Sequence, residues 1–381
     1  MMKILFFSPY FFPYVSGLSL LPYRILTHLS KDFCITVLTF PHEEHLKKKE
    51  YLSGLKVLRM PYLFRISKGY ISSQSIFFFI KETLRNDLIF INLPSVEGIF
   101  LVFFGFFMRK KIVAQYICDV KLPGSFFERL IEHFLRISTY IQLALSDKII
   151  TNKDYILGLP FPDYFKNKCI YSYPPITHLV PDKKEFTKMM KRKKTQMWVG
   201  YIGRIAREKG LTFLIQALVI LKEEIKNIVL VFGGPNPENT AGEKKYFHDV
   251  VKQLKQYHIP HLFYHNLSRG QLGALYKSID LLALPSTNRT EAFGMVQVEA
   301  MLAGRPVVAS NLPGVRVPVQ KTKMGLLVPP KNATKLAEAI KKILNNQAIY
   351  TQKSSIEQAK KMFDEKNVFH TYKTIFDLYQ K

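Results

Sequence analysis

The chain has 381 residues, which is too long for one ordinary domain and predicts two at roughly 100–200 residues each. Hydrophobic residues make up 48% of the chain and charged residues 22%, a composition that excludes disorder as the main state. Lysine and arginine total 55 against 29 aspartates and glutamates, a net charge of +26. Such an excess indicates an anionic partner: nucleic acid, an anionic membrane or a phosphorylated substrate.

Cysteine spacing and hydropathy indicate in which cellular compartment the protein is found. Cys34, Cys118 and Cys169 show no paired spacing, which argues against a disulfide framework or a zinc site and favours a reducing compartment. The longest apolar stretch, Ile99–Met108, is shorter than the roughly 20 residues that a membrane-spanning helix needs. We therefore expect a cytoplasmic protein with no transmembrane helix, and peripheral attachment to a membrane remains open.

The first half alternates short apolar runs with helical patterns, which is typical of βαβ units around a parallel sheet. The expected strands are Ile4–Ser8, Ile35–Thr39, Lys56–Met60, Leu88–Asn92, Ile112–Tyr116 and Lys148–Thr151. The expected helices are Leu18–Leu29, Ile76–Leu84, Glu97–Met108 and Phe126–Leu145.

The alternation stops and then restarts. Two prolines at Pro174 and Pro175 and a basic run up to Lys194 predict a linker over residues 176–196. The strands expected after it are Trp198–Ile202, Ile228–Phe232, Leu262–Tyr264, Leu281–Leu284, Val307–Ser310 and Gly325–Val328. The helices expected there are Leu211–Leu221, Lys244–Tyr257, Gln271–Ser278, Val296–Leu302 and Ala333–Leu344. The pattern predicts an α/β protein of two Rossmann-like domains, residues 1–175 and 197–366, that face each other across a ligand-binding cleft.

A pair of carboxylates stands out in the second half. Glu291 follows an expected strand, and Glu299 comes after seven intervening residues. Gly294 stands between the two carboxylates, just before a helix. Backbone N–H groups at a helix N-terminus suit phosphate, and carboxylates suit sugar hydroxyls. An ordinary surface turn followed by a helix is the alternative.

A basic loop precedes this pair. The strand Trp198–Ile202 ends at Gly203, and Arg204 and Lys209 follow before the next helix. Arginine can hold phosphate oxygens with two hydrogen bonds, and lysine adds a point charge, so the two cations could stabilise a departing diphosphate. The alternative is an ordinary basic loop in a basic protein.

Together these residues resemble the retaining glycosyltransferases of family 4, which have the GT-B fold. The resemblance rests on Gly203-Arg204 with Glu208-Lys209-Gly210 and on the Glu291/Glu299 spacing. It is supported in order along the chain by Phe232–Pro235, Tyr276–Ser286, Glu299–Ser310 and Gly325–Pro329. It covers residues 200–344 closely and the first half by layout only. It also implies that the C-terminal segment 367–381 is a helix that returns to the first domain.

The resemblance implies a role for each matching residue. Arg204, Lys209 and the backbone around Gly294, Met295 and Val296 would hold the donor diphosphate. Glu291 would contact the transferred sugar as a catalytic residue, and Glu299 would bind the nucleotide ribose. The remaining contacts to the donor sugar and nucleotide would come from Phe293, Gly233, Gly234 and Leu267.

The reaction implied is transfer of a hexose or N-acetylhexosamine from a UDP- or GDP-sugar, with retention at the anomeric carbon. The leaving phosphate oxygen would assist deprotonation of the acceptor. The resemblance implies no metal and no cofactor, because the nucleotide-sugar is a substrate, and the sequence has no Asp-x-Asp metal motif. Two alternatives stay open: a glycosyltransferase with a small-molecule acceptor, and a donor-binding protein of this fold without transfer activity.

The first half departs from the family pattern at two positions. The family has two glycines after its first strand; here Ser16 replaces one, and Gly17 matches the other, which would face the donor phosphate. Many members also have a histidine after the strand equivalent to Ile112–Tyr116. Asp119 takes that place here and is expected to contact the sugar or the acceptor hydroxyl as a second catalytic residue, unless it only caps a loop.

The acceptor is expected to bind the first domain. Apolar side chains form a broad stripe on the helix Phe126–Leu145, with further groups in Tyr62–Arg65 and Ile76–Ile80, beside basic residues. Core packing would account for most of these side chains; the alternative is a lipid-facing domain that attaches peripherally to the inner face of the membrane. That alternative fits a lipid-linked or cell-surface glycan acceptor. Nucleic acid is not expected, since we find neither a basic stripe on one helix nor interleaved aromatics on a sheet.

Overall fold

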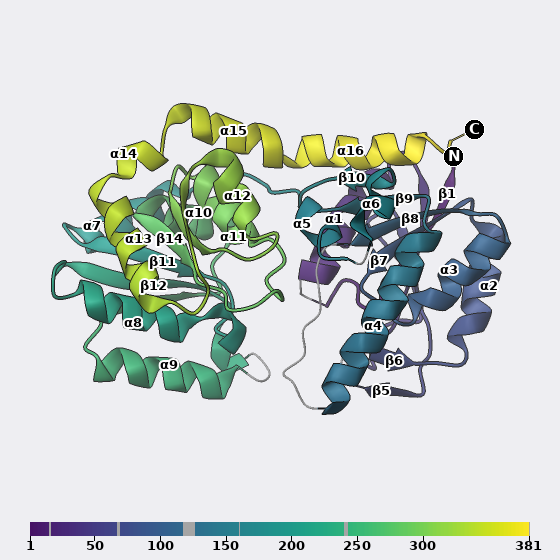
Figure 1. The fold of residues 1–381 in the computed structure, drawn as a ribbon, viewed down its shortest axis with the longest axis horizontal. Coiled ribbons are helices and arrows are strands. Elements are labelled where there is room, and N and C mark those ends of the chain that lie inside the picture. The colour runs from purple at the N-terminus through teal and green to yellow at the C-terminus, as the bar shows by residue number, and fades with distance from the viewer. Residues whose placement is uncertain (15–16, 67–68, 117–125, 160, 240–242, 381) are drawn as a thin grey trace. The chain divides into compact units, whose positions relative to one another are not determined.

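A computed structural model describes residues 1–14, 17–66, 69–116, 126–159, 161–239 and 243–380 (Figure 1). The chain forms two compact units. Unit 1 comprises residues 1–175 and 366–381, and unit 2 comprises residues 176–365.

Unit 1 is built on a sheet with the strand order β10-β9-β8-β7-β1-β2-β4-β3, in which only β3 is antiparallel to its neighbour. The strands are β1 (Lys3–Phe7), β2 (Cys34–Thr39), β3 (Lys49–Leu52), β4 (Leu55–Arg59), β7 (Leu88–Leu93), β8 (Lys111–Tyr116), β9 (Lys148–Thr151) and β10 (Cys169–Tyr171). A separate antiparallel pair consists of β5 (Phe64–Ile66) and β6 (Gly69–Ile71).

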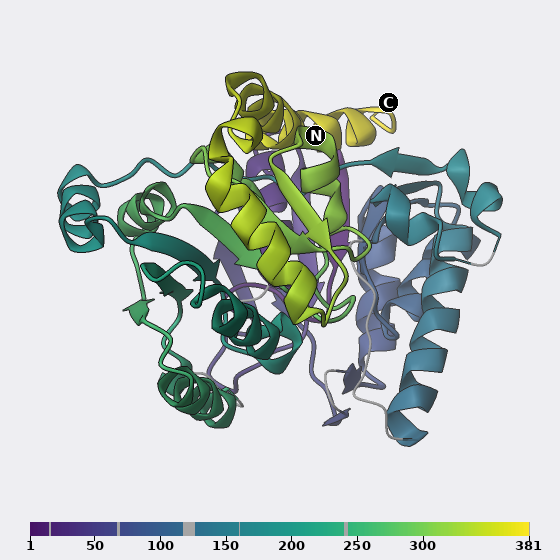
Figure 2. The ribbon, with the colours of Figure 1, turned by 60° about the vertical axis from the view of Figure 1, so that its left-hand side comes forward.

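Helices cover both faces of this sheet, because its strands are apolar on both sides. In β1, Ile4 and Phe6 belong to one buried cluster, and Leu5 and Phe7 belong to the other. The first cluster is completed by α1 (Gly17–Leu29) and α16 (Glu365–Asp377). The second is completed by α2 (Ser75–Arg85), α3 (Gly98–Phe107) and α4 (Phe126–Leu145), which lie side by side (Figure 2). Two short helices follow, α5 (Lys153–Ile156) and α6 (Pro162–Lys166).

The C-terminal helix α16 belongs to unit 1 although it comes about 190 residues after the rest of it. Phe369 stacks on His28 with ring centroids 4.3 Å apart, and Phe376 packs edge-on against Phe90 at 5.2 Å. Phe376 is completely buried. The helix therefore forms part of the core of unit 1.

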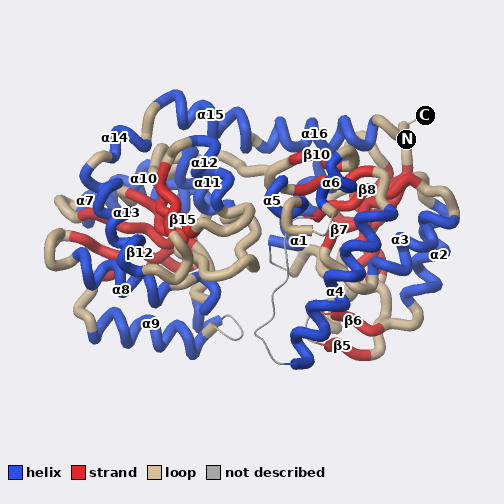
Figure 3. Tube along the Cα trace, viewed as in Figure 1, coloured by secondary structure: helices blue, strands red, loops and turns tan. Residues whose placement is uncertain are grey.

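Unit 2 contains a parallel six-stranded sheet in the order β13-β12-β11-β14-β15-β16 (Figure 3). The strands are β11 (Met197–Ile202), β12 (Ile228–Gly234), β13 (His261–His265), β14 (Leu281–Leu284), β15 (Val307–Ser310) and β16 (Gly325–Val328). The helices are α7 (Lys183–Lys193), α8 (Leu211–Leu221), α9 (Lys244–Gln256), α10 (Arg269–Ser278), α11 (Met295–Leu302), α12 (Arg316–Thr322), α13 (Ala333–Asn345), α14 (Gln347–Tyr350) and α15 (Lys353–Phe363), with 3₁₀ turns η1 (Arg207–Lys209) and η2 (Pro237–Asn239).

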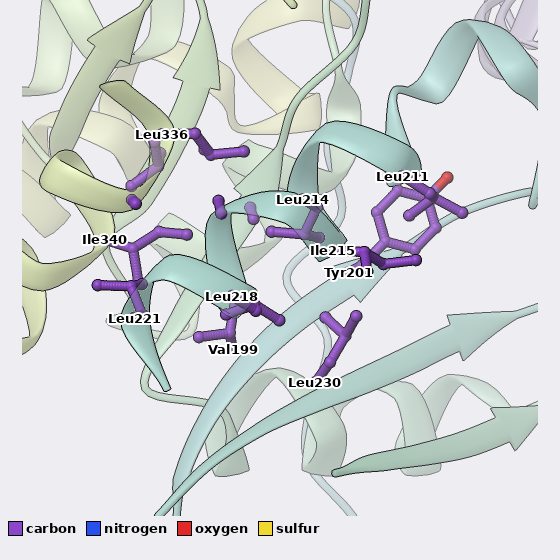
Figure 4. Close-up of a cluster of buried hydrophobic side chains, with 14 of the residues drawn as sticks. Val199, Tyr201, Leu211, Leu214, Ile215, Leu218, Leu221, Leu230, Leu336 and Ile340 are labelled. Carbon is purple, nitrogen blue, oxygen red and sulfur yellow. The ribbon is translucent and has the colours of Figure 1, made fainter. Parts of the chain in front are cut away.

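The strand order places β11 beside β14, with Val199 opposite Leu281. Chain order reverses between these two strands, and in open α/β sheets the crevice outside the carboxyl ends at such a point is the usual ligand site. The strands are held there by a continuous apolar core, in which Leu214 and Leu218 of α8 pack with Ile340 of α13 (Figure 4). The loops that follow β11 and β14 are therefore the first place to look for a functional site.

The elements expected from the sequence are all present, with ends shifted by a few residues. The expected linker at 176–196 differs, because residues 183–193 form the helix α7 within unit 2. The Asp182 side chain caps this helix by accepting from the Glu185 N–H at 3.0 Å, and Lys193 is buried with its Nζ 2.7 Å from Asp280. The basic run is therefore not a solvated loop. It forms a helix that buries Met189 and Lys193 on one face.

Among the described residues, no helix combines the length and the apolar character needed to cross a bilayer.

We predict that Phe376→Ala destabilises unit 1 by about 3–5 kcal/mol, because it removes a fully buried ring from the sheet–helix interface. Hydrogen exchange of peptides from β1 and β7 measures this, and both should exchange faster. His370→Ala on the exposed side of the same helix is the control and should change stability by less than about 0.5 kcal/mol. Equal exchange rates in the two variants would contradict the assignment of α16 to this core.

Candidate active site

Glycines bring the ends of β11 and β12 into close contact. The Gly203 N–H donates to the Gly233 carbonyl at 2.8 Å. A Cβ atom on Gly234 would lie 2.3 Å from the Gly203 carbonyl oxygen, so no larger residue fits there without a backbone shift. The Gly233-Gly234 turn therefore lies against the start of the loop that carries Arg204 and Lys209.

The same loop is fastened to the end of β14. Gly210 has φ +71°, and a Cβ atom there would lie 2.0 Å from the carbonyl oxygen of Pro285. The backbone N–H and side-chain hydroxyl of Thr287 both donate to the Glu208 carbonyl, at 2.8 and 3.1 Å. The loops after β11 and β14 are therefore held at fixed separation by backbone contacts.

This contact brings Lys209 and Glu291 together. The Lys209 Nζ lies 2.6 Å from the Glu291 Oε2, and the two side chains are only 19% and 13% exposed. The Ser286 hydroxyl donates to the same carboxylate oxygen at 3.2 Å. One lysine, one carboxylate and one hydroxyl thus form a half-buried polar cluster beyond the carboxyl ends of β11 and β14.

Arg204 has two carboxylate partners. It pairs through Nη1 with Glu243, a buried residue, and through Nη2 with Glu208 at 3.2 Å. Burial is the largest single influence on the pKa of Arg204 and lowers it. The charge and hydrogen bond of Glu243, together with the charge of Glu208, outweigh burial, so the guanidinium pKa lies above its ordinary value. The arginine stays charged, and about half of its side chain remains exposed.

The start of α11 supplies backbone donors. Gly294 is its N-cap with φ +72°, and a Cβ atom there would lie 2.4 Å from the Leu284 side chain. The buried Gln297 holds the turn, since its Nε2 donates to the carbonyls of Phe293 and Val315 at 2.6 and 2.9 Å. The N–H groups of Met295 and Val296 lie in the first turn, where a helix provides no acceptor for them and favours negative charge.

The second carboxylate, Glu299, lies one turn further along α11. Its Oε2 accepts a hydrogen bond from the Tyr276 hydroxyl of α10 at 2.5 Å. Burial, and then the charge of Glu299, raise the pKa of Tyr276 well above its ordinary value. Tyr276 therefore donates to Glu299 as a neutral phenol and fixes the position of the carboxylate.

Leu267 directly follows a residue that is hydrogen-bonded to the glycine turn. Its neighbour Asn266 donates its N–H to the Gly234 carbonyl at 2.9 Å and accepts from the Asn236 N–H at 3.1 Å. Leu267 itself is half-buried after β13. The turn and the leucine thus come from the adjacent ends of β12 and β13.

The expected residues of unit 2 lie on the loops that follow neighbouring strands and in α11. The expected residues of unit 1 are Gly17 and Asp119. Gly17 is exposed at the start of α1, with open space where a Cβ atom would lie. Asp119 lies outside the described residues, so its role stays a prediction.

Sequence reasoning missed the partners that hold the charged groups: Glu243, Ser286 and Tyr276. Ser286 and Tyr276 stood within the quoted motifs and could have been inferred from them. Glu243 had no signal, because it comes 39 residues after Arg204 in a different loop. In the part of the chain that the structure covers, no three His, Cys, Asp or Glu side chains are placed to hold a metal ion.

The chain is similar to known proteins in part of its sequence and in its fold. Residues 182–362, slightly under half of the chain, match the family model "Glycosyl transferases group 1". Solved structures match over 99% of the chain: sucrose-phosphate synthase of Thermosynechococcus elongatus and HepE of Anabaena in complex with UDP, each with TM-score 0.75, 19% identity and 99–100% of its own length covered. The chain has the GT-B fold.

Similarity to curated proteins covers only part of the chain. The chain is 30% identical over 161 residues to D-inositol 3-phosphate glycosyltransferase of Corynebacterium urealyticum, which covers 39% of the chain. It is also 30% identical over 156 residues, 40% of the chain, to the capsular polysaccharide biosynthesis glycosyltransferase CapM of Staphylococcus aureus. The matches span only 35% and 37% of these two relatives, about a third of their length.

We predict that Gly210→Ala lowers the free energy of unfolding of unit 2 by at least about 2 kcal/mol. The new methyl group would meet the Pro285 carbonyl and strain a positive φ. Urea unfolding followed by the fluorescence of Trp198, the single tryptophan, measures the effect within this unit.

Gly270→Ala is the matched control for this substitution. It lies in α10, where a Cβ atom would meet Asp182 at an ordinary 3.4 Å, so alanine should leave stability unchanged or raise it by up to about 1 kcal/mol. If Gly210→Ala were as stable as Gly270→Ala, the two loops would not depend on the close contact.

Proposed function

We propose that the protein is a retaining glycosyltransferase that moves a hexose or N-acetylhexosamine from a UDP- or GDP-sugar to a hydroxyl group. The observation that carries this proposal is the Lys209–Glu291 pair, held where the loops after β11 and β14 meet. It combines a cation for a leaving diphosphate with a carboxylate for sugar hydroxyls in one rigid cluster. The similarity of residues 182–362 to glycosyl transferases group 1 supports the same reading.

The diphosphate would be bound by Arg204, Lys209 and the first N–H groups of α11. An ammonium group has three donors, so Lys209 can keep its bond to Glu291 and still donate to a phosphate oxygen. Arg204 likewise offers more donors than Glu208 and Glu243 occupy. These fixed positive groups would stabilise the charge that develops on the leaving phosphate, and we propose that no metal ion is required.

The two carboxylates would bind the rest of the donor. Glu291, restrained by Lys209 and Ser286, would accept hydrogen bonds from hydroxyls of the transferred sugar. Glu299, restrained by Tyr276, would accept from the nucleotide ribose. Gly233 and Gly234 would let the backbone approach the nucleotide, and Leu267 would contact the base.

In the transfer step the bond from the anomeric carbon to the diphosphate oxygen breaks, and a bond from that carbon to the acceptor oxygen forms on the same face. The acceptor proton passes to the departing phosphate oxygen, which leaves as the nucleoside diphosphate. We propose that Asp119 contacts the sugar or the acceptor hydroxyl. Gly17 would supply a further backbone contact to the phosphate.

Two structures of one neighbour with the same fold support a uridine donor. HepE of Anabaena has been solved with UDP and with UDP-glucose, and it matches 99% of this chain. The resemblance does not distinguish UDP from GDP, so we propose both as candidates and favour UDP.

We propose a lipid-linked or cell-surface glycan acceptor at the cytoplasmic face of the membrane. The net charge of +26 supports an anionic surface as partner. A small-molecule acceptor is the second candidate, since one relative with 29% identity over 152 residues is named 2-deoxystreptamine glucosyltransferase. A protein that binds the donor without transfer is a third.

Release of nucleoside diphosphate from a panel of UDP- and GDP-sugars, supplied with a membrane extract as acceptor source, tests the activity. We expect release with one donor, reduced by about 10²–10³-fold in Lys209→Ala and in Glu291→Ala. The surface pair Lys335 and Glu338, 2.7 Å apart in the same unit, provides the matched controls Lys335→Ala and Glu338→Ala, which should keep full activity. Undiminished release in Lys209→Ala and Glu291→Ala would exclude this site.

The stereochemistry of the product tests the mechanism separately. With an α-linked nucleotide-sugar of gluco or galacto configuration as donor, the anomeric proton of the new glycosidic bond should show in its NMR signal the small coupling constant of an α-linkage. A β-linked product would mean attack from the opposite face and would exclude retention. The donor-binding alternative predicts that no glycoside forms, although the nucleotide-sugar binds.

A further inference from the structure

One helix layer of unit 1 exposes an unusual number of large apolar side chains. Helices α2, α3 and α4 bury one side on the sheet through residues such as Phe79, Leu101 and Leu143. Their outer sides expose eleven large apolar residues: Phe77, Leu84, Phe100, Phe103, Phe106, Phe107, Phe126, Phe127, Leu130, Phe134 and Ile137. We call these eleven residues the phenylalanine face. A concentration of this kind marks an interaction site rather than scattered surface residues.

The opposite helix layer of the same unit shows that this exposure is not a general property of the chain. Helices α1 and α16 cover the other face of the sheet. Within the described side chains of these two helices, no large hydrophobic residue is exposed. Of the two helix layers that cover the sheet of unit 1, it is the layer of α2, α3 and α4 that exposes large apolar side chains in the part of the chain that the structure describes.

The most exposed members lie at the ends of two adjacent helices. Phe107 at the end of α3 is 74% exposed, and Phe126 and Phe127 at the start of α4 are 77% and 73% exposed. Along α4 the exposed positions Phe127, Leu130, Phe134 and Ile137 recur every three or four residues and form a stripe. Such a stripe normally faces a core, and here it faces solvent.

Cations accompany the phenylalanine face on each helix. Lys81 of α2 holds its Nζ 5.7 Å from the centre of the Phe77 ring. Arg109 follows α3 directly, and Arg129 and Arg136 are exposed on α4. The acidic residues on these helices are Glu82, which is buried and pairs with Arg85 at 3.5 Å, and the half-buried Glu128 and Glu132 of α4. The exposed charges on this layer are therefore mainly positive.

We propose that the phenylalanine face docks onto an anionic lipid bilayer. Aromatic rings insert into the boundary between head groups and acyl chains, and basic residues beside them are attracted to anionic lipids. A second copy of the chain fits less well, because a symmetric interface would pack this mainly positive layer against an identical mainly positive layer. This inference rests on the function proposed above, and it identifies the side of unit 1 that would contact the bilayer. Vesicle binding can be measured without a sugar donor, so it tests this inference separately from the transfer activity.

The test uses the full-length chain and sedimentation with vesicles of phosphatidylcholine alone or mixed with phosphatidylglycerol. The triple variant Phe107→Ser/Phe126→Ser/Phe127→Ser should reduce binding to the anionic vesicles at least tenfold. Arg129→Glu/Arg136→Glu should reduce it at least about 20-fold, since each cation contributes roughly fivefold. All five side chains are exposed, and circular dichroism checks that the variants remain folded.

Matched controls lie elsewhere on the chain. Tyr51→Ser/Leu378→Ser removes large exposed side chains outside the phenylalanine face, and Lys353→Glu/Lys360→Glu makes the same charge change on α15. Both controls should bind anionic vesicles like the original chain. Equal losses in the controls would mean that only overall charge or hydrophobicity matters and would overturn the assignment of this face.

Other outcomes also decide the question. No sedimentation with anionic vesicles, or sedimentation unaffected by the triple variant, would overturn the proposal. A dimer seen by light scattering that the triple variant dissolves, without vesicle binding, would assign the face to a second copy. Vesicle binding by a protein that releases no nucleoside diphosphate would leave this inference standing and remove only the proposed transferase activity.

Discussion

The site in unit 2 depends on the contact between Gly210 and the Pro285 carbonyl. Only glycine can place the loop after β11 so close to the end of β14, because any Cβ atom would overlap the carbonyl oxygen. This approach, reinforced by the two hydrogen bonds from Thr287, sets the distance between Lys209 and Glu291. Without this contact, the two side chains would lie on separate flexible loops and would lose conformational entropy when they pair. An exposed ion pair contributes too little free energy to offset that loss by much.

The half-buried ion pair Lys209–Glu291 adds little net stability. Two unit charges about 4 Å apart attract by roughly 4 kcal/mol at an effective dielectric of about 20, and removing both from water costs a comparable amount. A pair of apolar residues would serve stability as well. The pair Lys209–Glu291 therefore makes most sense as a preorganised group that a ligand uses, and the same holds for Arg204 with the buried Glu243.

Sequence patterns predicted the parallel sheets, and they also predicted that the candidate donor-side residues lie on the loops at the ends of strands, because both depend on local signals. The roles of those residues stay predictions. Apolar runs alternating with helical periods specify a parallel α/β sheet, and the glycines and charges of the two loops stand close together in the chain. Glu243 could not be predicted in the same way, since it reaches Arg204 only through the folded position of α9. The helix α7 was hidden by its basic composition, although its buried Met189 and Lys193 follow a helical spacing.

Exposure was the other property that the sequence could not determine. A broad apolar stripe on Phe126–Leu145 fits either a core helix or an unpartnered one, and periodicity is the same in both cases. In the structure the two interpretations apply to different halves of the helix: Gln142 and Leu143 are buried, whereas Phe126 and Phe127 are largely exposed. The difference depends on how far the helix extends past the sheet, which is a property of the whole unit.

The candidate site does not account for the positive net charge of the chain. At the site, Arg204 and Lys209 contact three carboxylates, those of Glu208, Glu243 and Glu291. These five groups sum to −1, so the site contributes nothing to the excess of +26. A diphosphate would bind there through directed donors and not through a general positive field. The excess positive charge therefore lies outside the proposed donor site. An extended anionic surface, as we propose above, is the kind of partner on which dispersed charges add together.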